Sequence, residues 1–192
     1  CPPRAYASTE IDSGKRRARR AQRIERTQRA ACGAQREQMR FWDSSAIVPL
    51  LVREPSSPRS KALLREDPVM LAWWAAEVEC TSALARLERD QSLSKKAAVT
   101  AYQRLAAFRD AWNEVQPTAG LKEIATRLLR VHVLRAADAL QLAAAILAAE
   151  GRPSTLGFVC FDERLATAAR QAGFEVVGPL CLGSATSCPI KA

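Results

Sequence analysis

Histidine and closely spaced cysteines are scarce in this sequence. Its 192 residues include one histidine, His132, and six cysteines, none of which forms a Cys-x-x-Cys pair. A zinc site of the usual cysteine and histidine spacing is therefore not expected. His132 has no nucleophile paired with it in the sequence, so we expect it to be a structural residue.

Long apolar segments are also absent. No apolar run approaches the ~18 residues needed to cross a bilayer. No charged segment precedes the apolar core and small-residue cleavage site of a secretory signal. We therefore expect a cytoplasmic protein without a membrane partner. Cysteines stay reduced in that compartment, so we expect Cys80 and Cys160 to be buried free thiols.

Positive charge is concentrated at the N-terminal end of the chain. Residues 1–40 hold eleven Lys or Arg and four acids, a net charge of 11 − 4 = +7. The whole chain carries +9, so residues 41–192 account for only +9 − 7 = +2. The charge therefore does not make the folded part a strongly basic nucleic-acid binder.

Composition divides the chain into three parts. Residues 1–38 are rich in Arg, Ala and Gln, residues 39–180 carry the strand and helix signals, and residues 181–192 form a tail without periodicity. Three interpretations of residues 1–38 stay open. They are a disordered basic arm that touches phosphates, an exposed helix, or upstream sequence before a true start at Met39, which is the interpretation we favour because the segment has few large apolar residues.

Strand and helix patterns alternate from Met39 onward. This alternation predicts an α/β fold, with a short parallel sheet covered by helices. Ligands bind such sheets beyond the carboxyl ends of the strands. Strands are expected over residues 39–43, 68–72, 112–116, 156–161 and 175–177, and helices over 45–53, 57–66, 75–90, 94–111, 118–131, 136–149 and 163–172.

Four acids stand in apolar surroundings: Asp43, Glu79, Asp138 and Asp162. A buried carboxylate is costly unless it is paired or bound to a cation, and carboxylates that converge raise one another's pKa values. Mg²⁺ or Mn²⁺ removes this cost, because these hard ions prefer carboxylate oxygen. A structural alternative is that Asp43 and Asp162 cap helices, that Asp138 favours the dipole at a helix start, and that Glu79 pairs with a base such as Arg86.

Glu77 competes with Glu79 for a place in such a site. Two residues that are two positions apart on a helix point about 200° away from each other, so Glu77 and Glu79 cannot both face the same site. The residues themselves leave this choice open at this stage.

Four sequence segments resemble PIN-domain ribonucleases, in particular VapC toxins of bacterial toxin–antitoxin pairs. The segments are MRFWDSSAIV around Asp43, Glu79 followed by Ser82-Ala83-Leu84, LRAADALQLA around Asp138, and FVCFDERLATAA around Asp162. They occur in the family's order and cover about residues 39–179. The register of the resemblance selects Glu79 over Glu77.

The resemblance implies a PIN-like three-layer sandwich and an endoribonuclease. It implies that Asp43, Glu79, Asp138 and Asp162 bind Mg²⁺ or Mn²⁺ and activate water, leaving 5′-phosphate and 3′-hydroxyl ends. RNA substrate, a cognate antitoxin and a homodimer are the implied partners. Ser45 and Arg86 are our candidates for substrate binding, and Arg135 is a further candidate for a phosphate contact; each also has an ordinary structural alternative.

Two residues depart from the family's usual pattern. Cys160 stands where many relatives carry Thr, and Gln141 stands where His is frequent. Neither is an expected metal ligand, so we expect them to change hydrogen bonding around the ligands and not to abolish activity.

Other classes of protein fit less well. A non-catalytic PIN-like RNA-binding or scaffold domain is the main alternative, although all four acids are present. A haloacid-dehalogenase-like phosphatase needs a second Asp two residues after the first, where this chain has Ser45. A receiver domain needs an acidic pair before its first helix and a late Lys after a strand, and neither is found. The basic residues 1–38 leave nucleic-acid binding as a third alternative.

Overall fold

A computed structural model describes residues 39–178 of the chain. The predictions made for residues 1–38 and 181–192 lie outside these residues. The strands are β1 (Arg40–Trp42), β2 (Met70–Trp73), β3 (Asn113–Val115), β4 (Gly157–Val159) and β5 (Glu175–Val177). The helices are α2 (Ser44–Leu51), α3 (Ser57–Glu66), α4 (Ala76–Arg89), α5 (Lys95–Arg109), α6 (Ala119–Val131), α7 (Ala136–Ala148), the 3₁₀-helix η1 (Pro153–Thr155) and α8 (Glu163–Gln171).

The five strands form one parallel sheet in the order β3-β2-β1-β4-β5. The first strand lies at the centre, with Phe41 opposite Leu71 on one side and Phe158 on the other. The strand order reverses between β1 and β4, and in sheets of this kind the crevice beyond the carboxyl ends at such a point binds ligands. The predicted α/β fold with a parallel sheet is confirmed.

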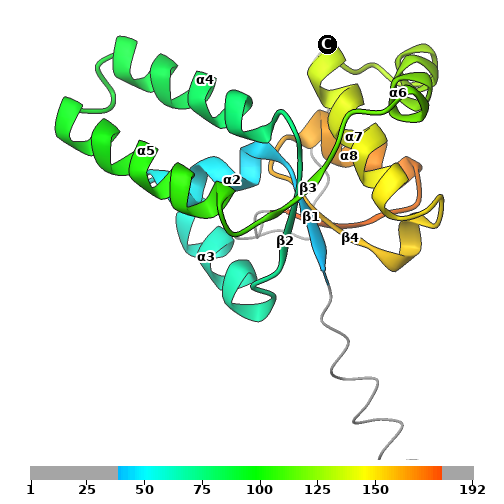
Figure 1. The fold of residues 1–192 in the computed structure, drawn as a ribbon, viewed down its shortest axis with the longest axis horizontal. Coiled ribbons are helices and arrows are strands. Elements are labelled where there is room, and N and C mark those ends of the chain that lie inside the picture. The colour runs from blue at the N-terminus through cyan, green and yellow to red at the C-terminus, as the bar shows by residue number, and fades with distance from the viewer. Residues whose placement is uncertain (1–38, 179–192) are drawn as a thin grey trace, which may run out of the picture. The chain divides into compact units, whose positions relative to one another are not determined.

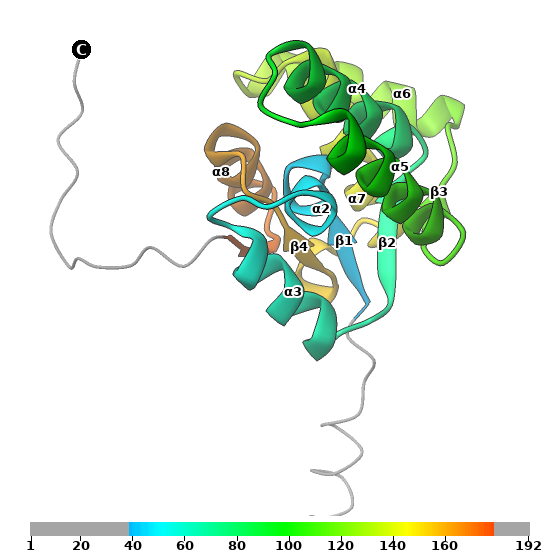
Figure 2. The same ribbon diagram turned by 90° about the vertical axis from the view of Figure 1, so that its left-hand side faces the viewer.

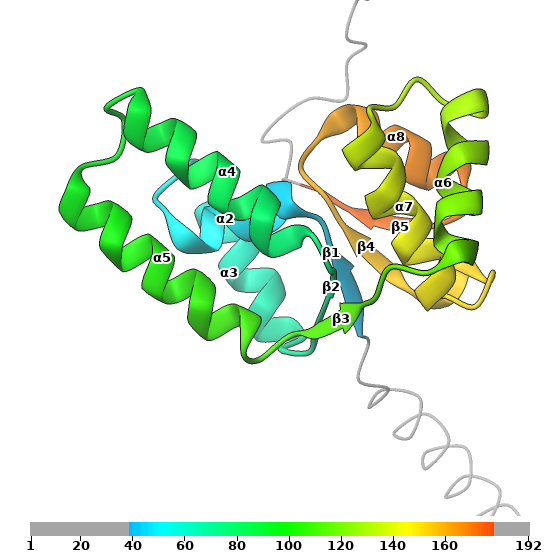
Figure 3. The ribbon, with the colours of Figure 1, turned by 45° about the horizontal axis from the view of Figure 1, so that its top comes forward.

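Helices cover both faces of the sheet. Helices α2 to α5 lie on one side and α6 to α8 on the other, as the views in Figure 1, Figure 2 and Figure 3 show. Successive residues of β1 point to opposite faces, so Trp42 packs with the first group of helices and Phe41 with the second. The three layers are the PIN-like sandwich that the resemblance implied.

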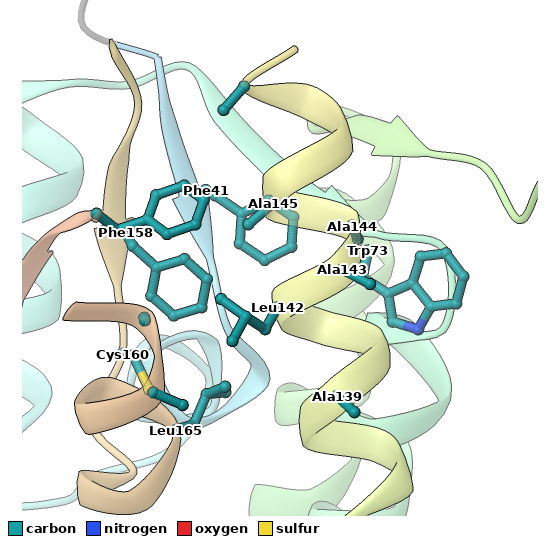
Figure 4. Packing of buried hydrophobic residues seen from close by; sticks show 14 of the residues in the cluster. Phe41, Trp73, Ala139, Leu142, Ala143, Ala144, Ala145, Phe158, Cys160 and Leu165 are labelled. Atoms are coloured by element: carbon teal, nitrogen blue, oxygen red, sulfur yellow. The ribbon is translucent and has the colours of Figure 1, made fainter. Parts of the chain in front are cut away.

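The core between the sheet and α7 depends on small residues. Phe41 and Phe158 stack with ring centroids 5.4 Å apart, and the side chain of Leu142 extends from α7 toward them (Figure 4). Alanines on α7 reach the same core, where they have no exposed surface: Ala139, Ala143, Ala144 and Ala145. Small side chains let the helix backbone approach the sheet closely, and this closeness brings the start of α7 to the sheet's carboxyl edge.

The predicted burial of Cys80 and Cys160 as free thiols is confirmed, and other local features accompany it. Ser94 caps α5 by accepting a hydrogen bond of 3.3 Å from the backbone nitrogen of Ala97. Trp73 is buried, whereas its neighbour Trp74 is 50% exposed. Within residues 39–178, no helix combines the length and the apolar character that crossing a membrane requires.

Candidate active site

Asp43 lies directly beyond the carboxyl end of the central strand. Its side chain is only 4% exposed, and its backbone nitrogen donates a hydrogen bond of 2.9 Å to the carbonyl of Val159 in β4. The carboxylate oxygen Oδ2 caps α2 by accepting from the backbone nitrogen of Ser45 at 3.0 Å. The same oxygen accepts a hydrogen bond from the Ser45 hydroxyl. Asp43 is thus held both by its strand and by the first turn of the following helix.

Ser45 connects this strand end to the end of β4. Its Oγ accepts hydrogen bonds from the backbone nitrogens of Phe161 at 2.9 Å and Asp162 at 3.2 Å. With its one proton donated to Asp43, all the hydrogen-bonding positions of the hydroxyl are used inside the protein. The structure therefore places Ser45 as a brace between two predicted site acids, and its role in substrate binding stays a prediction.

Asp162 and Asp138 each lie at the N-terminus of a helix. Asp162 caps α8, with Oδ1 accepting a hydrogen bond of 2.9 Å from the backbone nitrogen of Leu165. Asp138 stands in the first turn of α7, and its Oδ2 accepts a hydrogen bond of 3.1 Å from the backbone nitrogen of Arg135. The structural alternatives are thus correct for all three aspartates: Asp43 and Asp162 cap helices, and Asp138 lies in the first turn of one.

Glu79 reaches the same edge from the first turn of α4. Its Oε2 accepts a hydrogen bond of 2.6 Å from the amide nitrogen Nε2 of Gln141, a residue of α7 that is 1% exposed. Glu77 points elsewhere and forms an ion pair of 3.2 Å with the exposed Arg109. The predicted separation of Glu77 from Glu79 around the helix is confirmed, whereas an ion pair of Glu79 with Arg86 is not found among the described residues.

Three of the acids, Asp43, Glu79 and Asp138, lie close enough to interact electrostatically. Burial raises the pKa of Asp43, hydrogen bonds from Ser45 oppose the rise, and the negative charge of Asp138 adds to it. Burial also raises the pKa of Glu79, against hydrogen bonds from Gln141 and Ser44, and the charges of Asp43 and Asp138 raise it further. The charge of Asp138 thus raises the pKa of both Asp43 and Glu79, which belong to other segments of the chain.

Helix N-termini offset part of this repulsion. Helices α2, α7 and α8 all begin at the acidic edge, and Glu79 lies in the first turn of α4. The positive end of a helix dipole favours a carboxylate at this position, typically by about 0.3–1 kcal/mol when exposed. Four helix starts therefore supply partial positive charge to four carboxylates.

The four carboxylates fit a hard divalent cation in their chemistry. They offer the oxygen ligands that Mg²⁺ and Mn²⁺ prefer, and within residues 39–178 no Lys or Arg forms an ion pair with Asp43 or Glu79. No three Asp, Glu, His or Cys side chains of the described residues are gathered closely enough to hold a metal ion as they stand. Carboxylates repel one another until a cation offsets their charge, so the donors suit a metal that draws them together.

The other predicted contacts lie around the acids. Arg86 is exposed on α4, seven residues after Glu79 and therefore on the same face of the helix, about 10 Å further along its axis. Arg135 is exposed just before the first turn of α7. Both positions are compatible with phosphate contacts, which stay predictions.

Both departures from the family pattern contact a predicted site acid. The Cys160 thiol lies 3.6 Å from Oδ2 of Asp43 and 3.3 Å from the carbonyl of Asp162, and burial raises the pKa of this thiol, so it stays protonated and acts as a hydrogen-bond donor. Gln141 donates to Glu79 as described above. Cys160 and Gln141 therefore alter the hydrogen bonding around the acids, as expected.

Sequence reasoning missed one charged residue of the site. Arg164, on α8, lies with Nη2 3.6 Å from Oδ2 of Asp138 and 4.0 Å from Oδ2 of Asp162. The signal was present in the segment Asp162-Glu163-Arg164-Leu165. A cation in the first turn of a helix is unfavourable for the helix dipole, so its presence there predicts acids close by that offset this cost.

A parallel sheet with an acidic cluster at the carboxyl edge of its central strand defines the class as a PIN-like α/β domain. No known protein-family model matches the chain. Ribonuclease VapC45 of Mycobacterium tuberculosis strain CDC 1551 / Oshkosh and Ribonuclease VapC49 of strain H37Rv are each 35% identical to it over 136 residues. The alignments cover 71% of this chain and 92% of each relative. The chain therefore belongs to the VapC ribonuclease family.

Solved structures share the fold at lower sequence identity. A toxin–antitoxin complex from Klebsiella pneumoniae matches with a TM-score of 0.51 and 17% identity, covering 73% of this chain and 97% of that one. FitAcB from Neisseria gonorrhoeae matches with a TM-score of 0.53 and 18% identity, covering 75% of this chain and all of that one. These likenesses confirm the fold that the sequence predicted.

Proposed function

We propose that this protein is a divalent-metal-dependent endoribonuclease and the toxin of a toxin–antitoxin pair. The observation that carries the proposal is the convergence of Asp43, Glu79, Asp138 and Asp162, from four separate segments, at the carboxyl edge of one sheet. Relatives that share 35% identity are named ribonucleases, which supports RNA as the substrate.

The proposed site works through the placement of its carboxylates. A divalent ion, when bound, lowers the pKa of a water molecule and shields the charge of the phosphate. Asp43 contributes a buried carboxylate and Glu79 a partly buried one, and neither forms an ion pair with a Lys or Arg among residues 39–178. Ser45 and Gln141 hold these two carboxylates in position, and Asp138 and Asp162 complete the ligand set.

The test is RNA cleavage by the full chain in Mg²⁺, in Mn²⁺ and in EDTA. We expect cleavage in either metal and none in EDTA. Asp43→Asn is expected to lose activity by about a hundredfold or more, because it removes a charged ligand from the reaction centre. Asp90→Asn, at an exposed aspartate after α4, is the matched control and should keep full activity.

The outcome also separates this proposal from the non-catalytic alternative. A folded wild-type chain that leaves bulk RNA intact with metal present would favour an RNA-binding or scaffold domain. Equal cleavage by the Asp43→Asn variant and the wild type would show that the chemistry lies elsewhere.

We infer two protein partners for this chain. One is a cognate antitoxin that covers the acidic edge and stops cleavage, supported by a structural neighbour titled as a toxin–antitoxin complex. The other is a second copy of the chain, for which the half-exposed Trp74 and the exposed Val78, one helical turn further, offer apolar surface. Light scattering on the full chain should give twice the monomer mass, and co-expression with the antitoxin should abolish cleavage. A monomer, or undiminished cleavage, would contradict the respective inference.

A further inference from the structure

Arg164 is the basic residue in contact with the acidic cluster. Its Nη2 lies 3.6 Å from Asp138 and 4.0 Å from Asp162, and its side chain is 39% exposed. Among residues 39–178 no other Lys or Arg forms an ion pair with any of the four acids. One guanidinium thus offsets the charge of two carboxylates that belong to different helices.

The contact is electrostatic and loose. Strong hydrogen bonds between a guanidinium and a carboxylate measure about 2.7–2.9 Å and are often bidentate, whereas both distances here are longer. Each carboxylate already accepts a backbone hydrogen bond that anchors it without Arg164. The guanidinium is therefore not needed to position these acids, and little holds it in place.

The location of Arg164 adds a second reason for mobility. It stands in the first turn of α8, where a cation opposes the helix dipole. If another cation neutralised Asp138 and Asp162, the two ion pairs that hold the guanidinium would be lost, and Glu163 would be the only acid left in the first turn of α8. Arginine is well suited to move to a phosphate, because its planar fork of donors matches phosphate oxygens.

We propose that Arg164 is a displaceable internal cation. Its guanidinium contacts the acids of the site in the absence of metal and a phosphate of the RNA in its presence. Arg164 forms ion pairs with Asp138 and Asp162. If these two acids bound a divalent ion, the guanidinium would be free to contact a phosphate of the RNA. The inference rests on the proposed function and adds a positioning residue to it. In this scheme Arg164 weakens metal binding in the absence of RNA and strengthens RNA binding in the presence of metal.

Metal binding without RNA tests the first half. Mn²⁺ titrations of the full chain, followed by the free-ion signal in electron paramagnetic resonance, should give roughly three- to tenfold tighter binding for Arg164→Ala. Arg164→Lys keeps the competing charge and should remain near the wild type. Arg170→Ala, at an exposed arginine on the last turn of the same helix, is the matched control and should change affinity less than about twofold.

Steady-state cleavage at saturating Mn²⁺ tests the second half. Arg164→Ala should raise KM for RNA by roughly tenfold with a smaller change in kcat, and Arg164→Lys should recover part of the loss. Unchanged or weaker Mn²⁺ binding by Arg164→Ala would overturn the proposal, since it would make Arg164 a support of the ligand geometry. An unchanged KM would overturn the phosphate contact. A wild-type chain that binds no Mn²⁺ would overturn the proposed metal-dependent function itself, whatever Arg164 does.

Discussion

Gln141 donates a hydrogen bond of 2.6 Å to Glu79 and joins α7 to α4 at the acidic edge. A carboxylate only accepts, so the amide must present its nitrogen, and the amide oxygen of Gln141 is left without a hydrogen-bond partner among residues 39–178. An unsatisfied buried oxygen costs about 1–3 kcal/mol. We therefore expect the hydrogen bond donated to Glu79 to be the contribution of Gln141 to the site.

Gln141→Met should separate this function from packing. Methionine has a similar volume and no donor, so the fold should persist with a change of about 1 kcal/mol or less in the free energy of unfolding. RNA cleavage should fall by about tenfold or more, because Glu79 loses the residue that orients it. Gln103→Met, at an exposed glutamine of α5, is the control. Undiminished activity of Gln141→Met would mean that packing alone holds Glu79.

The two glutamates of α4 should behave differently. Glu79→Gln is expected to lower cleavage by about a hundredfold or more, because a charged carboxylate of the proposed ligand set is lost. Glu77→Gln removes only an exposed ion pair with Arg109, so cleavage should change by less than about twofold. Initial rates of both variants in Mn²⁺ make the comparison. The reverse order of effects would place the site on the other face of the helix.

Ser45→Ala should destabilise the protein. The variant leaves the backbone nitrogens of Phe161 and Asp162 without their acceptor and removes a donor to Asp43. A buried donor that loses its acceptor costs about 1–3 kcal/mol of folding free energy. Urea unfolding should show a loss in this range, against less than about 0.5 kcal/mol for the exposed Ser82→Ala. Equal midpoints for the two variants would refute the bracing role of Ser45.

Without metal, stability should depend on pH through Asp43. Its pKa is raised in the folded protein above the ordinary value of an aspartate, chiefly by burial, so the folded state binds the proton more tightly than the unfolded state. The resulting stabilisation is fully present below the unfolded pKa and is lost as the pH rises through the folded pKa.

Melting temperatures of the wild type and Asp43→Asn in EDTA, from pH 4 to pH 8, would check this. Asparagine retains a helix-capping oxygen and carries no charge, so the variant should lose less stability than the wild type as the pH rises. The other titrating groups are common to both proteins, so the difference between the two curves isolates Asp43. Parallel curves would show that Asp43 has an ordinary pKa in the fold.

Local pattern was enough to locate the elements and the aspartates. The runs ending at Asp43 and Asp162 are short, apolar and followed by helix signals, so their place at a sheet edge follows from alternation of strands and helices along the chain. The choice of Glu79 over Glu77 required the family resemblance, because periodicity says only that the two point in different directions.

The sequence by itself therefore determined the α/β fold and the order of its elements, since these depend on short-range periodicity, and it placed Asp43 and Asp162 at strand ends. Only the tertiary structure decided which side chains hold the four acids. Gln141 meets Glu79 across 62 residues, and the Ser45 hydroxyl meets Phe161 across 116. Arg164 reaches Asp138 from another helix. Such contacts depend on how closely α4, α7 and α8 pack around the sheet, and packing distances are set by the whole core and not by any one segment.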